Sequence, residues 1–162
     1  MVQTLTDAER LSIQAWGEEQ GAFGLVWRPV QMHVLRYVAG VLVAKAGIVE
    51  HRLASDVDGE LRIGGVGGVI TKPSVRGHGH ATAVMNYVGG YLCEQLKVNF
   101  GMLFCRDKLI PFYEALGWEV LEGPLTFQQP SGSVSSPFPA MILSCVSAPW
   151  PKRAVNLNSE PW

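Results

Sequence analysis

The chain has 162 residues, of which 48% are hydrophobic and 17% are charged, with a formal net charge of -1. This length suits one domain, and the hydrophobic content can form a sizeable core, which excludes a wholly disordered chain. The 13 lysines and arginines are balanced by 14 acidic residues, so no broad basic surface is available and nucleic-acid binding is disfavoured as the main task.

The cysteines and the apolar segments indicate in which cellular compartment the protein is expected to lie. The cysteines are Cys93, Cys105 and Cys145, and they show neither a CxxC nor a Cys/His spacing. The odd count argues against a disulfide framework or a zinc site, and predicts three small buried side chains. No basic segment followed by an apolar stretch opens the chain, and its most apolar run, residues 38–49, is too short to cross a bilayer. We therefore expect a cytoplasmic protein with no bound metal and no membrane partner.

The first predicted element is a helix that begins at a capping box. Thr6 and Glu9 have the spacing at which each side chain satisfies a free main-chain N–H of the other residue. We expect this helix to run to about Gly21, with Ile13 and Trp16 on its inner side. Three strands follow, at residues 33–43, 46–54 and 60–71. Residues 55–59 end in Asp-Gly between β-branched flanks, so the last two strands are predicted to be antiparallel neighbours.

The spacing of apolar residues then changes to 3 and 4 over residues 81–96, which predicts an amphipathic helix of about five turns. A short apolar strand at residues 100–105 precedes a second helix, capped by Asp107 and ended by Gly117. Two strands, at residues 118–121 and 140–146, complete the order. The sequence therefore predicts a mixed α/β fold in one domain, residues 1–162, whose tail, residues 148–162, folds back toward the active site.

The most informative segment, residues 69–81, joins a strand to a helix through a glycine-bearing turn. Gly77 and Gly79 leave successive main-chain N–H groups uncovered, and the start of the helix adds roughly half a positive charge. Arg76 adds a fixed positive charge with paired donors. These features together predict a receptor for a diphosphate.

Other interpretations of this turn are weaker. The glycines can be incidental to a tight connection, as glycine motifs often are. A dinucleotide fold requires a third small residue where the chain has Thr82, and a βαβ unit where an antiparallel hairpin is predicted. A Walker A loop is excluded because the chain has no GxxxxGK[ST] sequence.

Two motifs in order resemble a known family. Arg76-x-x-Gly79-x-Ala81 resembles the R/Q-x-x-G-x-G/A signature of the GNAT superfamily of N-acetyltransferases, whose loop binds the pyrophosphate of acetyl-CoA. Residues 112–118, FYEALGW, resemble the family's FYxxLGF/W sequence at the end of the next helix. The resemblance covers about residues 30–146. It implies the acyl-CoA N-acyltransferase fold, a mostly antiparallel central sheet flanked by helices.

The resemblance also implies where acetyl-CoA, the co-substrate, would bind. The pantetheine arm would lie beside strand residues Val69, Ile70 and Thr71. The diphosphate would lie on the loop formed by Arg76, Gly77, His78, Gly79, His80 and Ala81.

A narrower resemblance is to the aminoglycoside 2′-N-acetyltransferase branch, through residues 117–118, 123–126 and 130–132 and the final Glu160-Pro161-Trp162. In that branch a terminal tryptophan carboxylate lies near the substrate amines. Two acidic features of the branch are replaced here, one by Gly67 and a later cluster by residues 135–137. Both replacements would reduce the affinity for a polycationic sugar.

Acetyl transfer to an amine requires a polarised carbonyl, a deprotonated amine and a protonated leaving thiolate. Main-chain N–H groups at Val69 or Thr71 can polarise the carbonyl. Tyr113 matches the family's tyrosine that protonates the thiolate, so we predict it as the general acid. The tentative bases are Glu50 and the terminal carboxylate of Trp162, and His51 and Glu60 remain open as alternatives.

The prediction is therefore an N-acetyltransferase that moves the acetyl group of acetyl-CoA to a primary amine of a small molecule, which an aminoglycoside-like compound would supply. A non-catalytic acyl-CoA-binding domain and a transferase of longer acyl chains remain alternatives. Trp16, Phe23 and Trp27 are predicted to be core residues, with the wall of an acceptor pocket as the alternative. A homodimer paired through the C-terminal strands also remains open.

Overall fold

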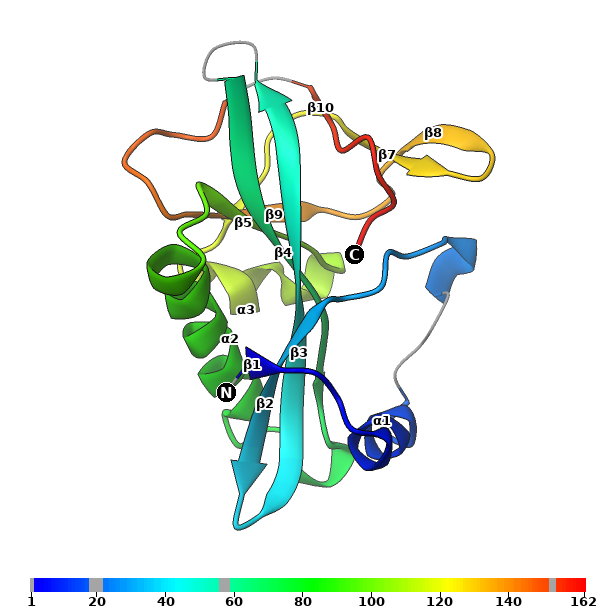
Figure 1. Ribbon diagram of the computed structural model, residues 1–162, viewed down its shortest axis with the longest axis vertical. Helices are drawn as coiled ribbons and strands as arrows, with labels where there is room; N and C mark the ends of the chain where they lie inside the picture. Colours follow the sequence, from blue (N-terminus) through cyan, green and yellow to red (C-terminus); the bar gives the residue numbers. More distant parts are fainter. Residues whose placement is uncertain (1, 18–21, 56–58, 152–153) are drawn as a thin grey trace.

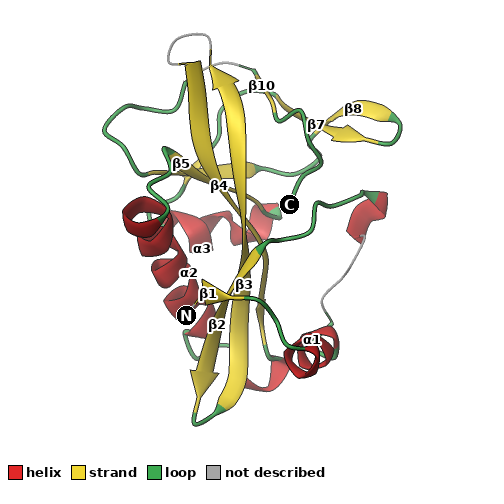
Figure 2. Ribbon diagram, viewed as in Figure 1, coloured by secondary structure: helices red, strands yellow, loops and turns green. Residues whose placement is uncertain are grey.

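A seven-stranded sheet is the centre of the computed structural model, which describes residues 2–17, 22–55, 59–151 and 154–162. Its strand order is β1-β2-β3-β4-β5-β9-β6, and the long β3–β4 pair runs most of the length of the molecule (Figures 1 and 2). Neighbouring strands are antiparallel except β4 and β5, which are parallel. The strands are β1 (Val2–Gln3), β2 (Met32–Val38), β3 (Val41–Ser55), β4 (Gly59–Thr71), β5 (Phe100–Phe104), β6 (Glu119–Val120) and β9 (Ala140–Ser144).

Among the described residues, two helices cover one face of this sheet, and the first helix and a smaller sheet lie over the other face. In β2, Val34 packs in the cluster of Val84 and Val88, whereas its neighbour Leu35 packs with Ile13 and Trp16. The helices are α1 (Asp7–Gln14), α2 (His80–Gly90) and α3 (Ile110–Glu114). Val84, Met85 and Val88 of α2 pack against small and branched residues of β3. The second sheet has the order β10-β7-β8, formed by β7 (Leu125–Gln129), β8 (Gly132–Ser135) and β10 (Val155–Asn156). The predicted fold class, a mixed α/β fold with a mostly antiparallel central sheet, is confirmed.

The first helix begins as predicted and ends earlier. The Glu9 main-chain N–H donates to Thr6 Oγ1 at 3.3 Å, and the Thr6 N–H donates to Glu9 Oε2 at 2.7 Å, which completes the capping box. Ile13 and Trp16 are buried, as expected. The helix ends at Gln14, so the predicted extension toward Gly21 is wrong, and Gly21 itself lies outside the described residues.

The predicted position of the turn between the first two of the three strands that follow is wrong. The first turn lies at Ala39 and Gly40, both with positive φ, of 47° and 76°, rather than near residue 45. Alanine seldom adopts this conformation, so the sequence carries no turn signal there. β3 and β4 are antiparallel, as predicted, with Ala54 opposite Glu60. The centre of their predicted turn, residues 56–58, lies outside the described residues.

The predicted helix at residues 81–96 corresponds to α2 and a π-helical turn, Tyr91–Gln95, that continues it. The prediction of three unpaired cysteines is wrong, because Cys93 in this turn forms a disulfide with Cys145, 52 residues later. β9 runs antiparallel to β5 and brings Cys145 beside the turn. This proximity depends on strand pairing, which the spacing of the cysteines does not reveal. Cys105 is a buried free thiol.

Two further observations concern metals and membranes. Among the residues that the structure describes, no three histidine, cysteine or acidic side chains gather as they would around a metal ion. No helix within the described ranges has the length and the apolar character needed to cross a membrane.

Candidate active site

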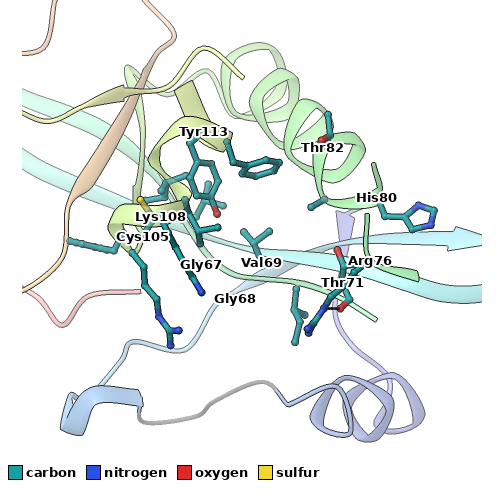
Figure 3. Close-up of a pocket in the computed structure, with 18 of the residues that line it drawn as sticks. Gly67, Gly68, Val69, Thr71, Arg76, His80, Thr82, Cys105, Lys108 and Tyr113 are labelled. Atoms are coloured by element: carbon teal, nitrogen blue, oxygen red, sulfur yellow. Dashed lines mark hydrogen bonds between the residues drawn. The ribbon is translucent and has the colours of Figure 1, made fainter. Parts of the chain in front are cut away.

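A large cavity opens where β4 and β5 separate. Their pairing joins Ile63 to Phe100 and ends with Val66 opposite Leu103. Beyond this point the strands line a cavity of about 930 Å³, with Gly67, Gly68 and Val69 on one side and Phe104 and Cys105 on the other (Figure 3). β4 continues along β3 as far as Thr71, so the edge of β4 that faced β5 turns its main-chain groups toward the cavity.

The start of α2 forms one end of the cavity. Gly77 and Gly79 have φ of 81° and 74°, a conformation that other residues adopt at a cost, and a Cβ at either position would meet nothing within 4 Å. The turn therefore requires the backbone freedom of glycine rather than its small size. Gly79 is the N-cap and its residue type offers no side-chain cap. The main-chain N–H groups of the first helical turn, at His80, Ala81 and Thr82, have no acceptor within the helix.

Basic side chains surround this helix start. Arg76 Nε donates to the main-chain oxygen of Thr71 at 3.2 Å, which holds the arginine beside the end of β4 (Figure 3). Arg36 Nε donates to His80 Nδ1 at 3.2 Å. Positive charge and main-chain donors that have no acceptor within the helix are the features that can bind an anion.

Eight of the nine residues predicted to bind the co-substrate line this cavity, and His78 does not. His78 is exposed, and its Nδ1 lies within hydrogen-bond distance of the main-chain oxygens of Val75 and Arg76. Thr82 also lines the cavity, although the predicted co-substrate loop ends at Ala81.

Tyr113 of α3 faces the middle of the cavity. Its side chain is 5% exposed and is held between the rings of Phe112 and Trp118, at centroid distances of 4.9 and 6.4 Å. Burial, with a smaller contribution from the Cys105 thiol, raises the pKa of Tyr113 to about 12. The phenol therefore keeps its proton at neutral pH, and Figure 3 shows the hydroxyl directed toward the side of the cavity formed by Gly67 and Val69.

Trp162 lies against the face of β4 that is opposite to Leu92. Its indole Nε1 donates to the main-chain oxygen of Met102 at 3.2 Å, and its side chain is 4% exposed. A Cβ on Gly65 would lie 2.2 Å from the indole ring, and a Cβ on Gly67 would lie 2.8 Å from the main-chain carbonyl carbon of Trp162. The two glycines therefore make room for Trp162, whose main-chain carboxyl group lies against Gly67, a residue of the cavity lining, although Trp162 itself does not line the cavity.

The structure does not bring Glu50 to this cavity. Glu50 is exposed, and its Oε2 lies 3.5 Å from Nη2 of Arg62. It lines a separate cavity of about 310 Å³ together with Arg28 and His51. His51 also lines this smaller cavity and not the large one, and Glu60 pairs with Arg52 at 2.6 Å on the exposed surface.

Several lining residues were missed or misplaced by sequence reasoning. Phe23 and Trp27 line the cavity, so their prediction as core residues is wrong, whereas Trp16 is buried as predicted. Phe138, from the loop before β9, also lines the cavity, and nothing in its local sequence marks it. Cys105, Arg106 and Lys108 carried a usable signal, because they lie at the junction between the predicted strand, residues 100–105, and the predicted helix that contains Tyr113.

Comparisons with known proteins agree with this geometry. Residues 4–121 match the protein family described as the acetyltransferase (GNAT) domain. The chain is 35% identical over 106 residues to an aminoglycoside 2′-N-acetyltransferase of Mycolicibacterium fortuitum. This match covers 65% of the chain and 53% of the relative, so the chain spans about half the length of that curated relative.

Solved structures show the same fold. The ribosomal-protein-S18-alanine N-acetyltransferase of Escherichia coli superposes with a TM-score of 0.58 at 16% identity, over 93% of this chain and 97% of that one. An acyl-CoA N-acyltransferase of Pseudomonas aeruginosa superposes with a TM-score of 0.58 at 15% identity, over 89% and 97% of the two chains.

Proposed function

The chain belongs to the GNAT family of acetyltransferases, and we propose that it transfers the acetyl group of acetyl-CoA to a primary amine of a small molecule. One observation carries the proposal. An anion-binding helix start and a buried, protonated phenol face the same separated strand within one cavity of about 930 Å³. This arrangement can hold a diphosphate at one end and protonate a leaving group at the other.

The residues divide the reaction among them. Arg76 and the main-chain N–H groups from Gly77 to Thr82 would hold the diphosphate, and β4 would run beside the pantetheine arm. A main-chain N–H at Val69 or Thr71 would polarise the acetyl carbonyl. The amine attacks the carbonyl carbon, the carbon–sulfur bond breaks, and Tyr113 gives its proton to the departing thiolate.

The attacking amine must also lose a proton. We assign this proton to the carboxylate of Trp162, because that group lies against Gly67, which lines the cavity. The alternative base, Glu50, faces a different cavity and is paired with Arg62. The Trp162 carboxylate would also attract a cationic amine toward the thioester.

The role of Tyr113 is tested by replacing it with phenylalanine, which keeps the ring and removes the proton donor. We expect Tyr113→Phe to lower kcat about 100-fold. The Kd for CoA should change by no more than about twofold, because the ground-state contacts remain. The measurements are thiol release from acetyl-CoA with a panel of amines and calorimetric titration with CoA.

Tyr87→Phe is the matched control, because Tyr87 is 48% exposed on α2 and does not line the cavity. It should leave both constants unchanged. A large loss of CoA affinity in Tyr113→Phe without a loss of kcat would contradict the role of general acid. Tight CoA binding with no thiol release for any amine would instead indicate an acyl-CoA-binding domain.

A further inference from the structure

Aromatic rings form the end of the cavity away from the helix start. We call Phe23, Trp27, Phe104 and Phe138 the aromatic wall. The ring of Phe138 lies 4.7 Å from that of Phe23 and 6.2 Å from that of Trp27, and Trp27 lies 6.4 Å from Phe104. All four line the cavity. Such a wall can bind a flat apolar group.

Phe23 is held in this wall in an unfavourable conformation. Its φ is 67°, a region that bulky residues seldom adopt, and its side chain is 56% exposed. The guanidinium carbon of Arg106 lies 5.1 Å from the centroid of its ring. Backbone strain of this kind persists where surrounding contacts fix it, and it is concentrated at ligand sites. The strain and the exposure of Phe23 are explained if the ring contacts a ligand.

The described side chains that line the cavity include basic residues and no acidic ones. Among the described residues that line it, none is aspartate or glutamate, whereas Arg76 and His80 lie near the helix start and Arg106 and Lys108 follow β5. Asp107, between these last two in the chain, does not line the cavity. A polycationic acceptor would therefore meet no acidic side chain of the described lining, while an anionic group would meet two basic ones.

We propose that the acceptor is a primary amine on a flat apolar body that also carries a carboxylate, with the body against the aromatic wall and the carboxylate beside Arg106 and Lys108. The amine would then lie near Trp162, whose indole ring is 5.9 Å from that of Phe104. This inference rests on the proposed acetyl transfer and specifies its substrate class. It differs from the polycationic sugar that the name of the Mycolicibacterium fortuitum relative suggests.

The test compares two amines that differ only in charge, para-(aminomethyl)benzoate and para-(aminomethyl)benzamide, with tobramycin as the polycationic amine. Binding to the CoA-loaded protein is measured by calorimetry, and kcat/KM is measured by thiol release from acetyl-CoA. We expect the benzoate to exceed the benzamide about tenfold in both measurements, since a charge-assisted hydrogen bond is lost in the amide. Tobramycin should be the poorest of the three.

Variants test which side chains cause the preference for the benzoate over the benzamide. Arg106→Gln with Lys108→Gln should reduce the benzoate-to-benzamide ratio to about one, because both cations are removed. Arg10→Gln is the matched control, since Arg10 is exposed on α1 and does not line the cavity, and it should keep the ratio of the unchanged protein.

The outcomes separate the two proposals. Benzamide or tobramycin binding as tightly as the benzoate, no binding of the benzoate, or an unchanged ratio in the double variant would each overturn the inference on the acceptor. Binding of the benzoate in preference to the benzamide, without thiol release from any amine, would overturn acetyl transfer and leave only the cavity's preference for an aromatic carboxylate.

Discussion

His51 links the C-terminal segment to Arg28 through its two ring nitrogens. Nε2 lies 2.9 Å from the main-chain oxygen of Leu157 and donates to it, so Nδ1 is the acceptor for Nη1 of Arg28, at 3.2 Å. The ring centroid lies 5.4 Å from that of Trp162. Burial lowers the pKa of His51, and the charge of Arg28 lowers it further, although the Leu157 hydrogen bond acts in the opposite direction. The folded protein therefore favours the neutral imidazole.

This preference gives the stability a pH dependence. The contribution of neutral His51 is fully present above its ordinary pKa of 6.5, and it is lost as the pH falls from that value through the lowered pKa of the folded state. Urea unfolding is measured at about pH 7.5 and about pH 5. The free energy of unfolding should fall more between these two pH values in the unchanged protein than in His51→Gln. His78→Gln, at an exposed histidine, should keep the original dependence. Equal losses in all three proteins would refute this account.

The assignment of the base can be tested at Gly67. An added Cβ would lie 2.8 Å from the main-chain carbonyl carbon of Trp162 and would displace it. Gly67→Ala should lower kcat about tenfold or more, because a small displacement of a reacting group is costly. Glu50→Gln should leave kcat unchanged within about twofold. If Glu50→Gln lowers kcat and Gly67→Ala does not, Glu50 is the base.

The sequence predicted the parts of the site that are local in the chain. Gly77, Gly79 and Tyr113 belong to short motifs whose chemistry can be read from neighbouring residues. Phe138 reaches the cavity from a loop more than a hundred residues beyond Phe23, which it contacts. Such a contact is determined by packing between segments, and no local pattern contains it.

At the scale of elements, α2 offers a direct comparison between two glycines. Gly79 precedes the helix with φ of 74°, whereas Gly90 at its end has helical angles, and a Cβ there would meet nothing within 4 Å. Gly79→Ala should destabilise the fold by about 1 kcal/mol, and Gly90→Ala should stabilise it by about 0.5–1 kcal/mol.

The same pair separates stability from binding. Gly79→Ala should weaken CoA binding about tenfold, because its strain moves the main-chain donors of the first helical turn. Gly90→Ala should bind CoA as the unchanged protein does. Thermal unfolding and calorimetric titration measure the two effects. Equal CoA affinity in both variants would show that the helix start does not hold the diphosphate.

Element types were easier to predict than their ends. The amphipathic spacing of α2 and the capping box of α1 are strong signals. The spacing repeats along the helix, and the capping box pairs Thr6 with Glu9, three residues later. The turn at Ala39 and Gly40 depends on the register between β2 and β3, and the two-residue strand β10 depends on its pairing with β7, which comes much earlier in the chain. Their positions follow from the register of the whole sheet, which a single sequence does not state.

At the scale of the molecule, the disulfide joins the turn after α2 to the end of β9. It closes a loop of 52 residues, and in the chain-entropy description such a crosslink contributes about 4 kcal/mol to the free energy of unfolding. A reductant should therefore lower the urea midpoint of the unchanged protein. It should not affect the double variant Cys93→Ala with Cys145→Ala. Three free thiols in protein isolated without reductant would contradict the pairing.

The disulfide also bears on the predicted compartment. Disulfides persist in oxidising compartments and are rare in the cytoplasm. The expectation of a cytoplasmic protein was based partly on three unpaired cysteines, and that basis is removed. A count of free thiols in protein trapped by alkylation directly in cells would identify the redox state in which the chain works.

The two ends of the cavity differ in the kind of atoms that form them. Around Gly67, Gly68, Gly77 and Gly79 the surface consists largely of peptide groups, whereas the aromatic wall and its cations consist of side chains. A point mutation changes a side chain and leaves the peptide group in place. Natural variation among the side chains of the aromatic wall can therefore change the choice of acceptor while the peptide groups at the helix start keep their place, provided that Gly77 and Gly79 are retained.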